Sequence, residues 1–208
     1  MQSDGNIVIS GGNAPMVEKQ FTRMISHCGR LLLCTFPSAN PTGTIARRKE
    51  LLKVVRPDIT MDAMTDDNAS DIDMDNYDAL WIPGGTTAKL MNSLHAHDMI
   101  EKFDAFRKKG RLIYGGSAGA IIMGKYISID PETLDGKYAI GLDWLGKKCG
   151  GGYSVASHWP DYHAEYVREF CRANKCRAIC CPEDTGAIFN LEGNLVSIIG
   201  NGIEFIES

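Results

Sequence analysis

The sequence of 208 residues lacks any long hydrophobic run. No apolar stretch approaches the ~20 residues that a membrane-spanning helix requires. Residues 1–5 also lack a basic segment followed by an apolar one, the two features that a secretory signal peptide combines. We therefore expect a protein with no membrane partner, located in the cytoplasm.

Positive charge is also in short supply, because 22 lysines and arginines are outnumbered by 26 aspartates and glutamates, for a net charge of -4. Nucleic-acid binding depends on clustered cations that release counterions from phosphates. The basic cluster at residues 47–49 is better explained as the solvated start of a helix. Its alternative role is pairing of Arg47 or Arg48 with a substrate carboxylate. We expect no nucleic-acid partner.

The seven cysteines include no Cys-x-x-Cys pair of the metal-binding or redox kind. Their odd number and scattered spacing indicate reduced thiols, and the apolar run around Cys180 and Cys181 predicts that both are buried. The acidic residues 66–75 lack the spacing and central glycine of an EF-hand loop. The sequence therefore implies no metal and no organic cofactor.

Short apolar segments alternate with helix-compatible segments along most of the chain. Strands are predicted at 6–10, 30–36, 77–83, 111–114, 153–157, 178–181, 187–190 and 195–199, with a less clear one at 58–61. Helices are predicted at 15–28, 45–55 (with Thr42 or Thr44 as its cap), 88–94, 98–109, 118–123 and 161–174. Residues 126–152 break this rhythm and are expected to be irregular, with short antiparallel pieces.

Strands that alternate with helices imply βαβ crossovers and a parallel sheet covered on both faces. We predict an α/β fold: a single domain over residues 1–208, doubly wound and flavodoxin-like, with a mostly parallel sheet. Active sites of such sheets collect at the carboxyl ends of the strands.

The motif Gly115-x-Ser117-x-Gly119 lies between a predicted strand and a predicted helix. This pattern is typical of a nucleophile elbow, in which small neighbours let strand and helix approach closely while the serine hydroxyl projects from the sheet edge. The start of the following helix offers unpaired N–H groups and a dipole that favours negative charge. We predict that Ser117 is a catalytic nucleophile.

A serine nucleophile needs a base to take its proton, and the chain has five histidines. His158 is our choice because it follows the predicted strand at 153–157 and should reach the same carboxyl edge as the elbow. His163, early in a helix, is the second candidate. Solvated or helix-capping roles are expected for the other three: His27, His95 and His97.

The base needs a carboxylate that holds its tautomer and orientation. Glu183 is favoured because it follows the predicted strand at 178–181, and the adjacent Asp184 is the alternative. Three acids also lie between the serine and the histidine in the chain, where turn formation is their expected role. They are Asp130, Asp135 and Asp143.

Acyl transfer also needs two N–H donors aimed at the developing oxyanion. The amide of Ala118, next after the nucleophile, is the natural first donor. Gly84 and Gly85 follow the strand at 77–83 and supply backbone without side chains at the same edge. We expect Gly85 to be the second donor, with a simple turn as the alternative.

Four segments together resemble the dipeptidase E (aspartyl dipeptidase) family of serine peptidases, which is related to cyanophycinase. They are Ile82-Pro83-Gly84-Gly85-Thr86-Thr87, Gly115-Gly116-Ser117-Ala118-Gly119-Ala120, Ser157-His158 and Pro182-Glu183-Asp184-Thr185. The resemblance implies a fold similar to class I glutamine amidotransferases. It also implies that Ser117, His158 and Glu183 are nucleophile, base and acid, with the amides of Gly85 and Ala118 binding the oxyanion. Residues 157–160 are compact compared with the extended loop of typical members.

The resemblance implies a small peptide substrate, with dipeptides that begin with aspartate as the expected class. Cyanophycinase-like or iso-aspartyl peptidase activity is an alternative. An α/β-type esterase is another, although its chain order would be serine, acid, histidine. A non-catalytic ligand-binding protein of the amidotransferase-like fold is the third. The oligomeric state stays open, with a homodimer as one option.

Overall fold

The computed structural model describes residues 5–133, 137–146, 152–160 and 163–207. A seven-stranded sheet has the order β3-β2-β4-β5-β1-β8-β9, and a smaller sheet has the order β10-β7-β6. From β3 to β1 all neighbours in the large sheet are parallel, whereas β8 and β9 are antiparallel additions. The predicted α/β fold with a mostly parallel sheet is confirmed.

The strands of the large sheet are β1 (Gly5–Ser10), β2 (Arg30–Cys34), β3 (Thr60–Met64), β4 (Ala79–Ile82), β5 (Leu112–Gly116), β8 (Gly186–Asn190) and β9 (Leu195–Ile199). The small sheet contains β6 (Tyr153–Ser157), β7 (Arg177–Cys181) and β10 (Glu204–Ile206). The helices are α1 (Pro15–Met24), α2 (Pro41–Val55), α3 (Thr87–Ala96), α4 (Met99–Lys108), α5 (Ala118–Met123) and α6 (Ala164–Asn174). Short 3₁₀ turns lie at Ala69–Asp71, Met74–Asn76, Ile127–Ile129 and Pro131–Thr133.

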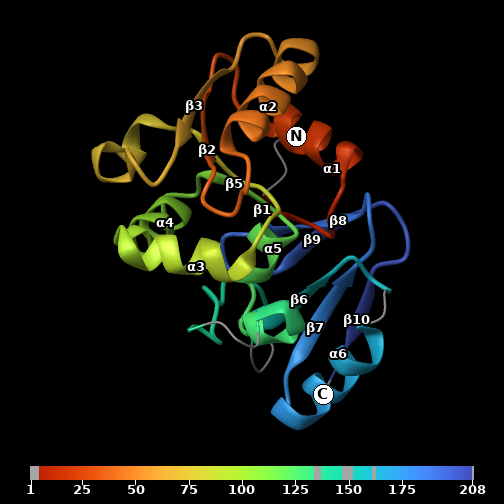
Figure 1. Ribbon diagram of the computed structural model, residues 1–208. Coiled ribbons are helices and arrows are strands. Elements are labelled where there is room, and N and C mark those ends of the chain that lie inside the picture. The colour runs from red at the N-terminus through yellow and green to blue at the C-terminus, as the bar shows by residue number, and fades with distance from the viewer. Residues whose placement is uncertain (1–4, 134–136, 147–151, 161–162, 208) are drawn as a thin grey trace.

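The two faces of the large sheet are covered by different helices (Figure 1). Alternate residues of β1 point to opposite faces, as the pleat of a strand requires. Val8 packs in one core with Phe21 of α1 and Leu52 of α2. Ile7 and Ile9 pack in the other core with residues of α3, α4 and α5. The burial of both faces explains why the central strands are apolar throughout.

The placement of β6 and β7 corrects the sequence-based expectation that they continue the main sheet. The antiparallel strand β8 occupies the free side of β1, with Val8 opposite Ile188, so no further parallel strand can pair there. β6 and β7 instead pair with each other in parallel, and β10, which was not predicted, pairs with β7. In Figure 1 this small sheet and α6 lie below and to the right of the main sheet.

Several element boundaries also differ from prediction. Helix α2 begins at Pro41 because the side chain of Asn40, rather than Thr42 or Thr44, accepts the Gly43 amide as N-cap. Helix α1 ends at Met24, and β3 lies later than predicted because its register with β2 starts at Thr60. In the irregular region after α5, the described residues form one isolated antiparallel bridge and two 3₁₀ turns.

Among the described residues, no helix has both the length and the apolar composition needed to span a membrane.

Candidate active site

Ser117 lies in a strained turn between β5 and α5. Its backbone φ is 47° and ψ is -112°, a conformation rare for a residue with a side chain. The Ser117 amide donates to the carbonyl of Ser10 at the end of β1, which fixes the turn to the neighbouring strand. A Cβ built on Gly119 would lie 2.2 Å from the carbonyl oxygen of Ile82, so only glycine permits α5 to approach β4 this closely. The elbow therefore presents Ser117 at the carboxyl edge of the sheet.

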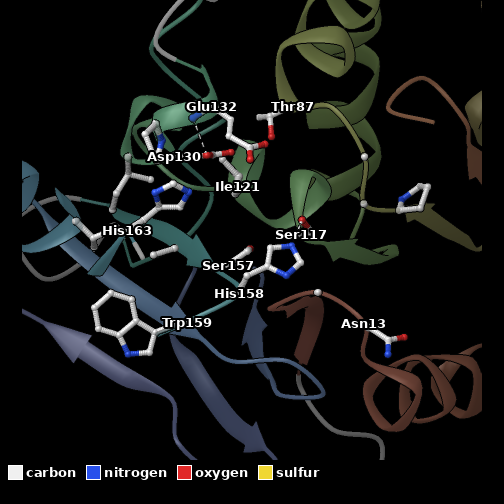
Figure 2. A pocket seen from close by; sticks show the side chains of 18 of the residues that line it. Asn13, Thr87, Ser117, Ile121, Asp130, Glu132, Ser157, His158, Trp159 and His163 are labelled. Carbon is white, nitrogen blue, oxygen red and sulfur yellow. Dashed lines mark hydrogen bonds between the residues drawn. The ribbon is translucent and has the colours of Figure 1, made fainter. Parts of the chain in front are cut away.

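His158 approaches the elbow from the end of β6 in the small sheet. Its Nε2 lies 2.9 Å from the Ser117 hydroxyl oxygen, and Figure 2 shows the two side chains pointing toward each other. The His158 amide donates to the carbonyl of Gly11, 2.7 Å away, in the loop that follows β1. A Cβ on Gly12 would lie 2.5 Å from the imidazole Cε1, so this loop and the imidazole ring are in close contact.

Glu183 follows β7, the parallel neighbour of β6, so the ends of these two strands bring its carboxylate to the imidazole. Glu183 Oε1 lies 2.5 Å from His158 Nδ1, and its Oε2 accepts the Asn13 amide. The alternative acid, Asp184, faces elsewhere: its Oδ1 accepts the amide of Met16 in the first turn of α1. Glu183 is therefore the carboxylate in contact with His158.

The two amides expected to bind an oxyanion flank Ser117. Ala118 is the first residue of α5, and a Cβ on Gly84 would lie 3.1 Å from the Ser117 Cβ, so the 84–85 segment lies against the serine. Among the described residues, no backbone carbonyl accepts the N–H of either Gly85 or Ala118. Both donors are consequently available at the elbow.

Ser117 and His158 line a cavity of about 620 Å³. Asp130 and Glu132 lie on one side of it, beside Thr87 and His163, as Figure 2 shows. Burial raises the pKa of Asp130, while a hydrogen bond from the Glu132 amide opposes that rise. Asp130 was predicted only as a turn residue; its position before Pro131 gave no sign that the chain returns here to the cavity.

Two arginines of α2 also line the cavity. Arg48 is 8% exposed and forms a two-pronged ion pair with Glu18, with N–O distances of 2.7 and 2.8 Å. Its guanidinium also lies 4.5 Å from the centre of the Trp81 ring. Burial raises the pKa of Glu18 and lowers that of Arg48, and the attraction between the two opposes both shifts. Arg47, by contrast, is exposed and donates to Asn13 Oδ1 over 3.4 Å.

The remaining candidates lie elsewhere or play other parts. His163 lines the cavity near Asp130, whereas the imidazole that meets the Ser117 hydroxyl is that of His158. Asp143 is not among the lining residues, and Asp135 lies outside the described residues. The other three histidines contact surface partners: His27 pairs with Asp58, His95 stacks on Tyr138, and His97 pairs with Asp66.

Metal-ligand chemistry is sparse in the described part of the chain. The one group there with three close donors is His27, Cys28 and Asp58, at the turn before β2. Both oxygens of Asp58 already accept from the guanidinium of Arg56, which leaves this carboxylate poorly suited to a cation. The described cysteines are free thiols, and Cys180 and Cys181 are fully buried as predicted.

Comparison with known proteins gives one family and a shared fold. The model of peptidase family S51 matches residues 7–193. A candidate peptidase E protein from Listeria monocytogenes EGD-e superimposes with a TM-score of 0.67 at 13% identity, covering 98% of both chains. A peptidase from an acI-B1 Actinobacterium gives 0.61 at 13% identity, covering 98% of this chain and 97% of the other.

A shorter match is to pyridoxal 5'-phosphate synthase subunit PdxT from Listeria welshimeri, 34% identical over 62 residues. PdxT from Listeria monocytogenes serotype 4b is 32% identical over a segment of the same length. These matches cover 30% of this chain and 33% of the PdxT proteins, so the chain spans about a third of their length.

We expect the Glu18→Ala variant to lose about 3–5 kcal/mol of unfolding free energy, because it leaves the Arg48 charge buried without its partner. Glu50→Ala is the matched control, since Glu50 pairs with Lys53 on the surface, where both side chains are more than 65% exposed. Its expected cost is about 1 kcal/mol or less. Urea denaturation of both variants checks this, and equal losses would contradict it.

Proposed function

From the premise that the chain belongs to peptidase family S51 and is a serine-type peptidase, we propose that it hydrolyses short peptides. The proposed substrates are, in particular, dipeptides with an N-terminal aspartate. In this proposal Ser117, His158 and Glu183 act as nucleophile, base and acid. The amides of Gly85 and Ala118 bind the oxyanion.

The observation that carries the proposal is the continuous chain of contacts from Ser117 through His158 to Glu183. The distances of 2.9 Å and 2.5 Å along it are within hydrogen-bonding range. A serine hydroxyl becomes a useful nucleophile only when a neighbouring base accepts its proton. A carboxylate on the far nitrogen holds the imidazole in the required tautomer and stabilises the imidazolium that forms.

The reaction follows from these positions. His158 Nε2 takes the hydroxyl proton as Ser117 Oγ attacks the scissile carbonyl carbon, and the carbonyl oxygen acquires negative charge between the amides of Gly85 and Ala118. The C–N bond breaks as His158 returns the proton to the leaving amine. Water then attacks the acyl-enzyme in the same manner and regenerates the Ser117 hydroxyl.

The size and charge of the cavity support a small peptide with a free amino terminus. Its volume of about 620 Å³ is in the range of small-molecule sites. Asp130 and Glu132 give one end of it negative charge, suited to an α-ammonium group (Figure 2). The aspartyl preference rests on the four motifs that resemble dipeptidase E.

The order of the contacting groups favours this proposal over an esterase of the α/β-hydrolase type. That class has its acid between serine and histidine in the chain. Here the carboxylate on His158 comes from Glu183, after both.

The first test is chemical. A fluorophosphonate should label wild-type protein and leave Ser117→Ala unlabelled, and that variant should lose all measurable hydrolysis of Asp-Leu. Among Asp-Leu, β-Asp-Leu and Ala-Leu, the first should have the highest kcat/KM for the wild type. Faster β-Asp-Leu cleavage would favour the iso-aspartyl alternative, and a folded, unlabelled wild type would contradict catalysis by Ser117.

A second test separates the two adjacent acids. Glu183→Gln should lower kcat by about 10²- to 10⁴-fold, because the imidazole loses the carboxylate that orients it. Asp184→Asn is the matched control, since Asp184 contacts the start of α1 and should change kcat less than about threefold. Steady-state kinetics on Asp-Leu measures both. A larger loss of kcat in Asp184→Asn would assign the acid to Asp184.

A third test concerns the acidic end of the cavity. Asp130→Asn should raise KM for Asp-Leu by about tenfold or more, because a charged hydrogen bond to the α-ammonium is lost. N-acetyl-Asp-Leu, which lacks that charge, should be hydrolysed equally by both proteins. Asp98→Asn, an exposed substitution outside the cavity lining, is the control. An equal rise in KM for both peptides would contradict a role in binding the amino terminus.

A further inference from the structure

Arg47 is the arginine at the cavity whose charge is not already matched by a buried acid. Its neighbour Arg48 pairs with both oxygens of Glu18 and lies over the Trp81 ring, so its guanidinium is already bound within the protein. Arg47 lies on the exposed face of α2 and lines the same cavity. Its hydrogen bond to Asn13 Oδ1 is long, at 3.4 Å, and joins it to a neutral amide.

That bond fixes the side of the cavity on which Arg47 lies. Asn13 follows Gly12, and a Cβ built on Gly12 would lie 2.5 Å from the His158 ring. The Asn13 amide donates a hydrogen bond to the Glu183 carboxylate. Arg47 is thus connected to the loop that contacts the imidazole. In Figure 2, Asn13 lies on one side of Ser117, and Asp130, Glu132 and His163 lie on the other.

The position of the His158 base determines which residue of a dipeptide lies at which end of the cavity. His158 must protonate the leaving amine, so the departing residue lies on the side of the imidazole. The acyl residue, with its α-ammonium, then extends toward Asp130 and Glu132. In a dipeptide, the departing residue ends in a carboxylate, and that carboxylate comes to the side where Arg47 lies.

We propose that Arg47 binds the free C-terminal carboxylate of the departing residue and so selects dipeptides; this rests on the proposed function. The planar guanidinium has donors spaced to match both oxygens of a carboxylate. The weak contact with Asn13 is easily exchanged for this stronger, charged one. A longer peptide carries a neutral amide at this point and its carboxylate farther away, so it gains nothing from Arg47.

Binding to a protein that cannot turn over its ligand tests the proposal separately from catalysis. In the Ser117→Ala background, calorimetry measures Kd for Asp-Leu and for its C-terminal amide, Asp-Leu-NH2. We expect the free acid to bind about 10- to 100-fold more tightly, the range for a hydrogen bond to a charged group. Adding Arg47→Gln should remove this preference by weakening binding of the acid while leaving that of the amide within about twofold.

The matched control is Lys49→Gln, which removes the same charge from the same helix at an exposed residue outside the cavity lining. It should preserve the preference for the free acid. Equal binding of acid and amide by the Ser117→Ala protein, no binding of either, or an equal loss in Lys49→Gln, overturns the role of Arg47.

Hydrolysis by otherwise wild-type protein distinguishes this failure from failure of the proposed function. If the acid preference depends on Arg47 but no dipeptide is cleaved, the proposed peptidase activity is wrong and the carboxylate site stands. If dipeptides are cleaved and Arg47→Gln leaves the ratio of kcat/KM for acid and amide unchanged, the carboxylate site is wrong and the activity stands.

Discussion

The loop after β1 is the constraint on which the site depends, because it joins two separate sheets. Ser10 accepts the Ser117 amide from the large sheet, and Gly11 accepts the His158 amide from the small one. Asn13 then donates to Glu183 and accepts from Asp184. Three chain segments distant in sequence are therefore aligned by backbone groups of one short stretch, which runs from the last residue of β1 to Asn13 in the loop that follows. Apart from the bond to the Glu183 carboxylate, these bonds join backbone groups and do not depend on which side chains are present, which suits a proposed reaction whose groups must be held within a fraction of an ångström.

The close approach of this loop to Cys181 and to the His158 ring is the second condition, and it limits which residues can form the loop. A Cβ at Gly11 would lie 2.1 Å from the carbonyl oxygen of Cys181, and one at Gly12 would overlap the imidazole. These contacts bring the ends of β1, β6 and β7 to one point. The absence of side chains here is thus a requirement of the junction between the sheets, distinct from the glycines of the elbow that admit α5.

Much of this arrangement follows from local sequence, and the rest does not. The alternation of strands and helices and the 115–119 motif predict the α/β fold and the elbow, because both depend on neighbours in the chain. Which strands pair is a long-range property: 153–157 has the same apolar character as strands of the main sheet, so its place in a second sheet was missed. Asp130 was likewise missed, since a residue before proline looks like any turn.

Two separate parts of the chain give the cavity its acidic and its basic side chains. The acids come from the irregular segment after α5, whereas Arg47 comes from α2, which packs on the opposite face of the large sheet from α5. Neither segment contributes to the contacts among Ser117, His158 and Glu183. The closest link is the 3.4 Å bond from Arg47 to Asn13, whose amide donates to Glu183. In this proposal, substrate selection and chemistry are therefore assigned to different parts of the chain.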